Sequence, residues 1–300
     1  MASLFDSLQN YEPITKGYSS DKKYKVSTSE SFSNCSRDGT NYLLRISQIE
    51  QYEAKKLMFS RQRQVADLGV PMCQPIEFGT CEQGVYSIQS WLSGEDLAEH
   101  TTHLSDGELY ALGLKAGEIL KKIHTIPSPN APNDKTSIRI QKYHDCGIRF
   151  DGDNYILEYL KNNQHLLRGR PQCFLHGDYH IGNMMLENGN LAIIDFDRCG
   201  FGDCWQDFSS IVWSAQASPF FATGQIKGYF NGEPPPEFFK LLAFYLASNA
   251  LSYIYWAIPF GQGEINTALN QAQDILLWYN NMQNPVPKWY LKDLYIQWVD

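Results

Sequence analysis

The spacing of apolar residues along the chain changes character near residue 93. Upstream of that point, short apolar runs bounded by turn residues predict four β-strands, at residues 24–28, 41–47, 76–78 and 85–92. Apolar residues also recur at roughly helical spacing over residues 50–68, and Gly69 and Pro71 predict where that helix ends. The first lobe is therefore expected to be small and rich in strands.

Downstream of Ser93 and Gly94 the pattern is mainly helical. Residues 104–123 predict a long amphipathic helix, and Ser105 followed three residues later by Glu108 is typical of a capping box at its start. Further helices are expected over residues 138–167, with an interruption near 147–153, and from residue 208 onward, with breaks at 232–236 and 261–263. We therefore predict an α+β, bilobal fold, with a small β-rich lobe over residues 1–92 and a larger α-helical lobe over residues 93–300.

Composition limits the possible classes of function. The 300-residue chain carries 25 Lys and Arg against 33 Asp and Glu, a net charge of -8, whereas a nucleic-acid-binding protein would present a basic face. The seven cysteines include no Cys-x-x-Cys pair and no zinc-ligand spacing, so reduced, mostly buried thiols in a cytoplasmic protein are expected. No nucleic-acid partner is predicted, and the oligomeric state stays open.

Two segments bear on membrane attachment. The first seven residues have neither the basic nor the apolar stretch that is typical of a signal peptide. Residues 241–260 carry no charge and approach the length of a membrane span, but they contain Ser248, Asn249 and Ser252 and a proline near their end. A buried helix of the large lobe is favoured, and no membrane partner is expected.

Polar residues with the spacing needed for phosphoryl transfer follow Leu175. Asp178 and Asn183 are five residues apart in a turn-like segment, and Asp195 follows a short apolar strand twelve residues later. Phosphoryl transfer needs a carboxylate near the attacking hydroxyl and oxygen ligands for Mg²⁺. Asp178 is therefore the candidate base, and Asn183 and Asp195 are the candidate metal ligands, all expected in one β-hairpin.

Two histidines flank the candidate base. No third His or Cys with suitable spacing accompanies His176 and His180, so a zinc site built from them is not expected. His176 lies next to the end of an apolar strand, and the favoured interpretation is a buried group that braces the loop through hydrogen bonds. A turn that only caps its own backbone is the alternative for any one polar residue of this segment.

Residues 176–183, with the sequence His-Gly-Asp-Tyr-His-Ile-Gly-Asn, resemble the HGDxHxxN catalytic loop of the aminoglycoside phosphotransferase-like kinases. Residues 194–197, Ile-Asp-Phe-Asp, stand where that family has its metal segment, and residues 200–207 resemble the block that follows. The resemblance implies a protein-kinase-like fold, with Asp178 as the base and Asn183 and Asp195 as magnesium ligands. It further implies that Asp207 is a buried brace of the catalytic loop and that Asp197 is either an acid close to the metal or a solvated side chain.

The resemblance also implies a nucleotide site in the small lobe. Residues 16–21, with Ser19 and Ser20, fall where the family has its phosphate-covering loop, and backbone N–H groups with a serine hydroxyl can cradle phosphates. Backbone groups of Ser90 and Leu92, in the hinge, are expected to contact the purine.

A cation on the third strand is expected to bind phosphate. That residue is usually a lysine in the family, and here it is Arg45, whose planar fork of donors also suits phosphate. Its expected partner on the following helix is Glu53, with Glu50 as the alternative.

We therefore expect Mg²⁺-assisted transfer of the γ-phosphate of ATP or GTP to a hydroxyl of a small-molecule substrate, with an aminoglycoside or related antibiotic as the leading acceptor. The alternatives are a macrolide kinase, a kinase of choline, an amino alcohol or a sugar, and a nucleotide-binding protein without turnover. Carboxylates of the large lobe are candidates for binding a cationic acceptor: Glu95, Asp151, Asp153, Asp203, Glu264 and Asp274. The aromatic stretch over residues 253–256 could stack on a sugar or pack the core, and packing is favoured.

Overall fold

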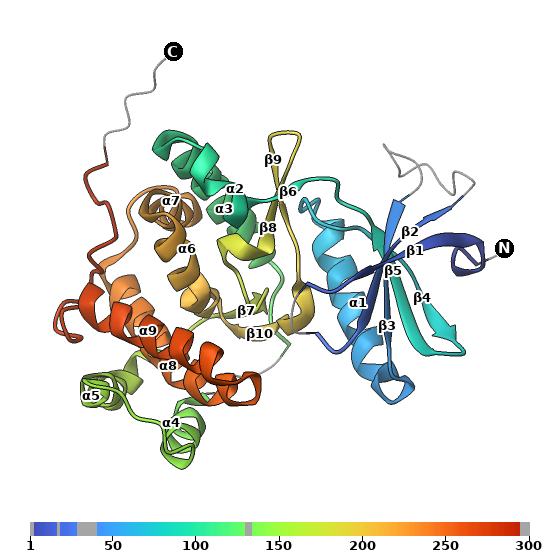
Figure 1. The fold of residues 1–300 in the computed structure, drawn as a ribbon. Helices are drawn as coiled ribbons and strands as arrows, with labels where there is room; N and C mark the ends of the chain where they lie inside the picture. The colour runs from blue at the N-terminus through green and yellow to red at the C-terminus, as the bar shows by residue number, and fades with distance from the viewer. Residues whose placement is uncertain (1–2, 17–18, 29–40, 130–133, 295–300) are drawn as a thin grey trace. The chain divides into compact units, whose positions relative to one another are not determined.

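The computed structural model describes residues 3–16, 19–28, 41–129 and 134–294 and divides the chain into two compact units (Figure 1). One unit comprises Met1–Glu95 with Met185–Asp197, and the other comprises Asp96–Met184 with Arg198–Asp300. The first boundary lies close to the predicted one at residue 92. The segment 185–197, which the sequence placed in the second lobe, packs instead with the first unit.

An antiparallel sheet of five strands forms most of the first unit, in the order β1-β2-β3-β5-β4. The strands are β1 (Leu8–Ile14), β2 (Lys22–Thr28), β3 (Asn41–Ser47), β4 (Pro75–Cys81) and β5 (Gly84–Ser90). Helix α1 (Tyr52–Asp67) lies against the sheet, as Figure 1 shows, and buries Phe59, Gln62 and Val65. Strand β1 was not predicted, because five of its seven residues are exposed and give no apolar alternation.

The segment 185–197 joins the first unit through a short sheet and backbone contacts. Strands β8 (Met184–Glu187) and β9 (Asn190–Ile193) form a hairpin, and β6 (Glu95–Asp96) pairs with β8. The Ile193 N–H donates to the Pro71 carbonyl at 2.8 Å, and the Ser93 N–H donates to Glu187 Oε1 at 2.7 Å. These contacts link residues about 100 positions apart, and local spacing in the sequence therefore does not predict them.

Helices form most of the second unit. They are α2 (Leu97–His100), α3 (Asp106–Ile123), α4 (Thr136–Asp145), α5 (Asp153–Asn163), α6 (Ile211–Ala217), α7 (Pro219–Phe230), α8 (Pro236–Ala257) and α9 (Gln262–Trp278). The predicted capping box of α3 is confirmed: Ser105 Oγ accepts from the Glu108 N–H, and Glu108 Oε2 accepts from the Ser105 N–H. Short 3₁₀ turns connect other elements: Phe5–Ser7, Ile49–Gln51, Thr101–His103, Gln164–Leu167, Ile181–Asn183, Phe196–Arg198, Cys204–Ser210 and Ile258–Phe260.

Glycines allow α3 and α7 to pack with their backbones in close approach. A Cβ atom on Gly117 of α3 would lie 2.2 Å from the carbonyl oxygen of Gln225, and one on Gly228 of α7 would lie 2.0 Å from that of Leu114. Neither helix can carry a larger side chain at these positions without moving apart from the other.

Helix α8 is the apolar run that the sequence singled out. The described segment Pro236–Phe260 is long and apolar enough to cross a membrane, by length and composition only, but 67% of its most apolar window is buried inside the protein. The prediction of a buried helix is confirmed, because the apolar surface of α8 is covered by other parts of its own unit.

Strand β7 (Gln172–Leu175) leads into the loop that carries the predicted motif. It pairs antiparallel with β10 (Gly200–Asp203), with Gly200 opposite Leu175 and Gly202 opposite Cys173. The prediction of a single hairpin around the motif is wrong, because the structure has two strand pairs there, β7 with β10 and β8 with β9. Asp178 follows β7, Asn183 precedes β8, and Asp195 follows β9.

Candidate active site

Asp178 is held by the loop that connects β7 to β8. Its side chain is 21% exposed, and Oδ1 accepts a hydrogen bond from Ser210 Oγ at 3.1 Å. Two cationic or potentially cationic groups lie slightly farther away: His180 Nε2 at 3.6 Å from Oδ1, and Arg198 Nη1 at 3.7 Å from Oδ2. The carboxylate is thus oriented by a neutral hydroxyl and partly open to solvent, which suits a group that must receive a substrate hydroxyl.

A buried carboxylate anchors the start of this loop. Asp207 is 2% exposed and accepts hydrogen bonds from the backbone N–H groups of His176 and Gly177, each at 2.7 Å, and from His124 Nε2 at 3.1 Å. His176 is fully buried, and its Nδ1 accepts from the Asp178 N–H at 3.2 Å. The sequence-predicted residues His176, Asp178 and Asp207 therefore meet in one hydrogen-bonded network.

Further contacts hold the middle of the loop. The Tyr179 hydroxyl donates to the Ala116 carbonyl at 2.7 Å, and the Ile181 N–H donates to Ser214 Oγ at 3.0 Å. Gly177 has a φ of +86°, and a Cβ there would lie 2.1 Å from the Arg198 carbonyl oxygen, so only glycine fits. A loop pinned at so many points presents Asp178 with little conformational freedom.

The two predicted metal ligands offer oxygen atoms of the kind that Mg²⁺ prefers. Asn183 Nδ2 donates to the Asp178 carbonyl at 2.9 Å, which leaves the amide Oδ1 as the ligand atom. Asp195, in the other unit, is exposed and has a φ of +64°, a conformation that is uncommon for a residue with a side chain. Such a backbone conformation is often found at functional sites.

Arg45 of β3 lies among acidic groups. It forms ion pairs with Asp21, at 3.1 Å, and with Asp197, and its Nη2 lies 3.4 Å from Ser19 Oγ. Lys55 Nζ also binds Asp21, at 2.6 Å. Burial lowers the pKa of Arg45, but the charges of Asp197 and Asp21 outweigh it and raise the pKa overall.

The predicted ion pair between Arg45 and Glu53 is not formed. Glu53 and the alternative Glu50 are both exposed, whereas the Lys55 side chain is only 19% exposed. The face of α1 nearest Arg45 therefore presents a lysine, and Asp21 on β2 supplies the negative charge that was expected from the helix.

The other nucleotide-site predictions involve backbone groups and small hydroxyls. Ser19 Oγ accepts from the Asp21 N–H at 3.2 Å, and Ser20 is exposed, while Gly17 and Tyr18 of the same segment lie outside the described residues. The Ser90 N–H donates to the Gln74 carbonyl at 2.9 Å, so of its two backbone groups the carbonyl is the one left to contact the purine of a nucleotide. Leu92 is half-buried in the segment after β5.

Aromatic side chains complete a ring of contacts around Asp178 within the second unit. We call Trp213, Tyr253 and Trp256 the aromatic wall. Its ring centroids follow one another at 5.7 and 5.8 Å. His180 lies 6.2 Å from Trp213 at one end, and the Arg198 guanidinium lies 5.4 Å from the Trp256 ring at the other.

The aromatic wall is half-buried and therefore presents part of its surface. His180 and Arg198 both lie close to the Asp178 carboxylate. One end of the aromatic wall is therefore linked to Asp178 through His180 and the other end through Arg198. Tyr253 and Trp256 thus pack against other rings, as was favoured, while the half-buried faces leave stacking on a ligand as a prediction.

Several residues of the site were not anticipated. Ser210, Ser214 and His124 each support the Asp178 loop from a different part of the chain, and no spacing rule connects them with it. Arg198 directly follows the Ile-Asp-Phe-Asp segment, and this position in the sequence was the signal that could have marked it as a residue of the site.

Comparison with known proteins identifies the architecture. The model of the phosphotransferase enzyme family (APH) matches residues 10–239. A thermostable mutant of aminoglycoside phosphotransferase APH(4)-Ia shares 16% identity at a TM-score of 0.65, covering 91% of this chain and 96% of that one. A choline/ethanolamine kinase family protein from Mesorhizobium loti shares 14% identity at a TM-score of 0.67, covering 92% and 91%.

A third similar structure is the amicoumacin kinase hAmiN, with 14% identity, a TM-score of 0.63 and coverage of 94% and 93%. Among curated proteins, no sequence match is found. At these identities the structural likeness establishes the fold, and the predicted protein-kinase-like α+β fold is confirmed.

Proposed function

The chain belongs to the phosphotransferase enzyme family (APH), and from that premise we propose that it transfers the γ-phosphate of ATP or GTP to a hydroxyl of an amino-bearing small molecule. An aminoglycoside or a related antibiotic is the first candidate acceptor. The observation that carries the proposal is Asp178, a partly exposed carboxylate on a rigidly held loop and beside an aromatic wall.

Asp178 orients the acceptor hydroxyl and receives its proton. The hydrogen bond from Ser210 holds Oδ1, and Oδ2, which lies 3.7 Å from Arg198 Nη1, would accept from an incoming hydroxyl. Because phosphoryl transfer requires little covalent chemistry from the protein, such positioning accounts for much of the rate.

Asn183 and Asp195 would hold Mg²⁺ through their side-chain oxygens. An ion held there would supply positive charge to offset the negative charge of the phosphates. Ser19, Ser20 and Arg45 would face the phosphates, and backbone groups of Ser90 and Leu92 would face the base. A nucleotide co-substrate is supported by similar structures, one of APH(4)-Ia with ADP and hygromycin B and one of hAmiN with AMP-PNP and Ca²⁺.

The acceptor is expected to carry a cationic amine. The aromatic wall offers ring faces to a cation, and the Arg198 guanidinium already occupies such a position over Trp256. Of the six candidate carboxylates, Asp203 is engaged by Arg170 and Tyr245, and Asp153 by Tyr143. Glu264 accepts from the Tyr253 hydroxyl at 2.6 Å and is the carboxylate adjoining the wall.

The same wall favours a second candidate acceptor. An amino alcohol such as choline or ethanolamine presents one ammonium group, which fits three aromatic rings and one carboxylate better than it fits a broad acidic surface. A structure from the choline/ethanolamine kinase family is among those similar to this chain. Selectivity between the two classes is therefore the main quantity to measure.

A coupled assay of ADP or GDP release in the presence of Mg²⁺ tests the proposal. The screen would cover aminoglycosides, macrolides, choline, ethanolamine and sugars, with each nucleotide. Asp178→Asn should lower turnover by about 10²–10⁴-fold with the fold intact. Asp145→Asn, an exposed carboxylate on α4, is the matched control and should keep full activity. If the parent chain released no ADP or GDP with any compound of the screen, nucleotide binding without turnover would be favoured instead.

A further inference from the structure

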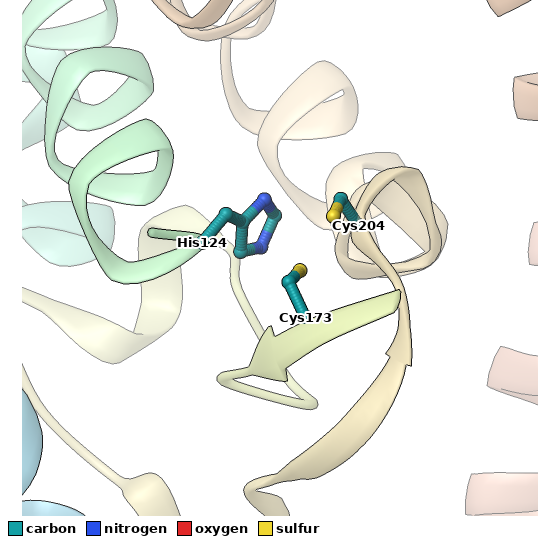
Figure 2. Close-up of side chains that lie close together, drawn as sticks. All are labelled: His124, Cys173 and Cys204. Atoms are coloured by element: carbon teal, nitrogen blue, oxygen red, sulfur yellow. The ribbon is translucent and has the colours of Figure 1, made fainter. Parts of the chain in front are cut away.

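Three potential metal ligands converge behind the catalytic loop. They are His124 at the end of α3, Cys173 in β7 and Cys204 at the start of the 3₁₀ turn after β10. One ligand atom from each lies within 4.8 Å of the other two. Figure 2 shows both sulfur atoms and the imidazole ring directed toward a common centre.

The fold explains why residues so far apart in sequence meet. In the β7–β10 register Gly202 lies opposite Cys173, so Cys204, two residues later, falls on the same face as the diagonal neighbour of Cys173. The Phe174 N–H donates to the Ile126 carbonyl at 2.8 Å, which brings the end of α3 beside β7. Spacings of 49 and 31 residues cannot be recognised as a metal motif in the sequence, where no Cys-x-x-Cys pair occurs.

We propose that His124, Cys173 and Cys204 bind Zn²⁺ as three protein ligands, with water in the fourth tetrahedral position. Thiolate and imidazole groups are the ligands that zinc selects, whereas Mg²⁺ prefers oxygen, so this site would not compete for the ion used in phosphoryl transfer. With Zn–S bonds of about 2.3 Å and Zn–N bonds of about 2.0 Å, tetrahedral ligands lie roughly 3.5–3.8 Å apart. The observed upper limit of 4.8 Å requires the ligand atoms to approach one another by about 1.3 Å at most, a movement within the reach of side-chain rotation.

Both ring nitrogens of His124 have polar partners. Its Nε2 lies 3.1 Å from Asp207 Oδ2 and its Nδ1 lies 3.0 Å from the Tyr229 hydroxyl. A zinc ion would replace one of these partners, and the remaining one would fix the orientation of the ring, as outer partners of zinc-bound histidines do.

Burial is also consistent with such a site. His124 is 9% exposed and Cys173 is 2% exposed, while Cys204 is half-buried and offers the way in for the ion. Two thiolates would balance the charge of the ion, while the Asp207 carboxylate beside His124 keeps its hydrogen bonds from the His176 and Gly177 N–H groups.

The location gives the ion a structural role. It would join the end of α3, strand β7 and the turn that carries Asp207, which are the three segments that position the catalytic loop. Zinc binding should therefore stabilise the second unit, and this expectation does not depend on the proposed phosphotransferase function.

Cobalt substitution tests the site directly on the full-length chain. The protein would be purified with a non-thiol reductant, stripped with a chelator and titrated with Co²⁺. We expect one equivalent to bind with an intense thiolate-to-cobalt charge-transfer band, and Zn²⁺ to displace it. Melting temperature should rise with Zn²⁺, because the ion binds only the folded site.

Matched cysteine variants locate the ligands. In Cys204→Ser and Cys173→Ser the band should disappear and Zn²⁺ affinity should fall by more than about 100-fold, the upper end of the loss for an outer partner alone. Cys146 is a half-buried thiol that donates a hydrogen bond to the Tyr143 carbonyl. The control variant Cys146→Ser should bind Co²⁺ and Zn²⁺ as the parent does.

Absence of the charge-transfer band from the folded, reduced parent protein would overturn the proposal, as would equal affinity in the parent and in Cys204→Ser. The parent measurement stands by itself if either variant fails to fold. A Cys173–Cys204 disulfide that forms only without the reductant, with no metal bound in its presence, would show a thiol pair instead of a zinc site.

Discussion

Replacing Asp207 with asparagine tests whether the catalytic loop is held from beneath by a single carboxylate. Asp207 Oδ1 accepts from the Gly177 N–H, and Oδ2 accepts from both the His176 N–H and His124 Nε2. An amide keeps one acceptor oxygen, so it can replace Oδ1, but its NH₂ group would face two donors.

The energetic cost follows from the bonds that are lost. Two hydrogen bonds to a charged group are worth about 1.5–3 kcal/mol each, and His124 can recover one by changing tautomer and accepting from the amide. The His176 N–H remains buried without an acceptor. We expect Asp207→Asn to lower the free energy of unfolding by about 2–4 kcal/mol, the low end allowing for the desolvation cost that a neutral side chain avoids.

Thermal and urea denaturation measure this change. At about 2–4 °C per kcal/mol for a unit of this size, the melting temperature should fall by roughly 5–15 °C. Asp145→Asn makes the same substitution at an exposed position, where Asp145 accepts a hydrogen bond from Gln141, and the free energy of unfolding should stay within about 0.5 kcal/mol of the parent. Equal stability of Asp207→Asn and the parent would refute the idea that this carboxylate braces the loop.

The same variant separates stability from chemistry once an acceptor is known. A loop displaced by about 1 Å should lose on the order of 10²-fold in turnover below the melting transition, with a smaller effect on nucleotide affinity. Full turnover at a reduced melting temperature would mean that the loop keeps its geometry without Asp207.

Two further predictions concern other parts of the molecule. Gly117→Ala should lower the free energy of unfolding by about 1–3 kcal/mol, because its Cβ would meet the Gln225 carbonyl oxygen. The control Gly263→Ala has open space around its Cβ and should raise the urea midpoint slightly through helix propensity. Equal effects of the two substitutions would disprove the close approach of α3 and α7. Burial raises the pKa of Asp21, but hydrogen bonds from Lys55 and Ser47 and the charge of Arg45 outweigh it and hold the pKa below its ordinary value. The stability this carboxylate contributes is therefore complete above about pH 4 and lost as the pH falls below that, so Asp21→Asn should flatten the pH dependence of the urea midpoint there, and an unchanged slope would contradict it.

The sequence predicted those features whose signals are local. The capping box of α3 and the strand β3 each lie within a short window where propensity and spacing agree with the final structure. Strand β1 and the move of residues 185–197 into the first unit escaped prediction because both depend on pairing with distant segments.

The same distinction explains what was missed in the site. Asp178, Asn183 and Asp195 are recognisable because their spacing follows the course of one loop and one hairpin. Lys55 takes the position expected of Glu53 because side-chain direction on α1 depends on how the helix lies against the sheet, and sequence spacing does not report it.

Rigidity of the catalytic loop comes mainly from backbone atoms, and this has a consequence for specificity. His176, Gly177 and Ile181 are held through their N–H groups, so these hydrogen bonds use no side-chain atom of the loop, although position 177 itself admits only glycine. The loop can therefore stay constant while the aromatic wall, built from α6 and α8, changes. Under the proposed function, the reaction would depend on a short contiguous segment, whereas acceptor choice would depend on side chains from separate helices. A substitution in the wall, such as Trp213→Ala, should accordingly alter the acceptor KM while leaving the loop in place.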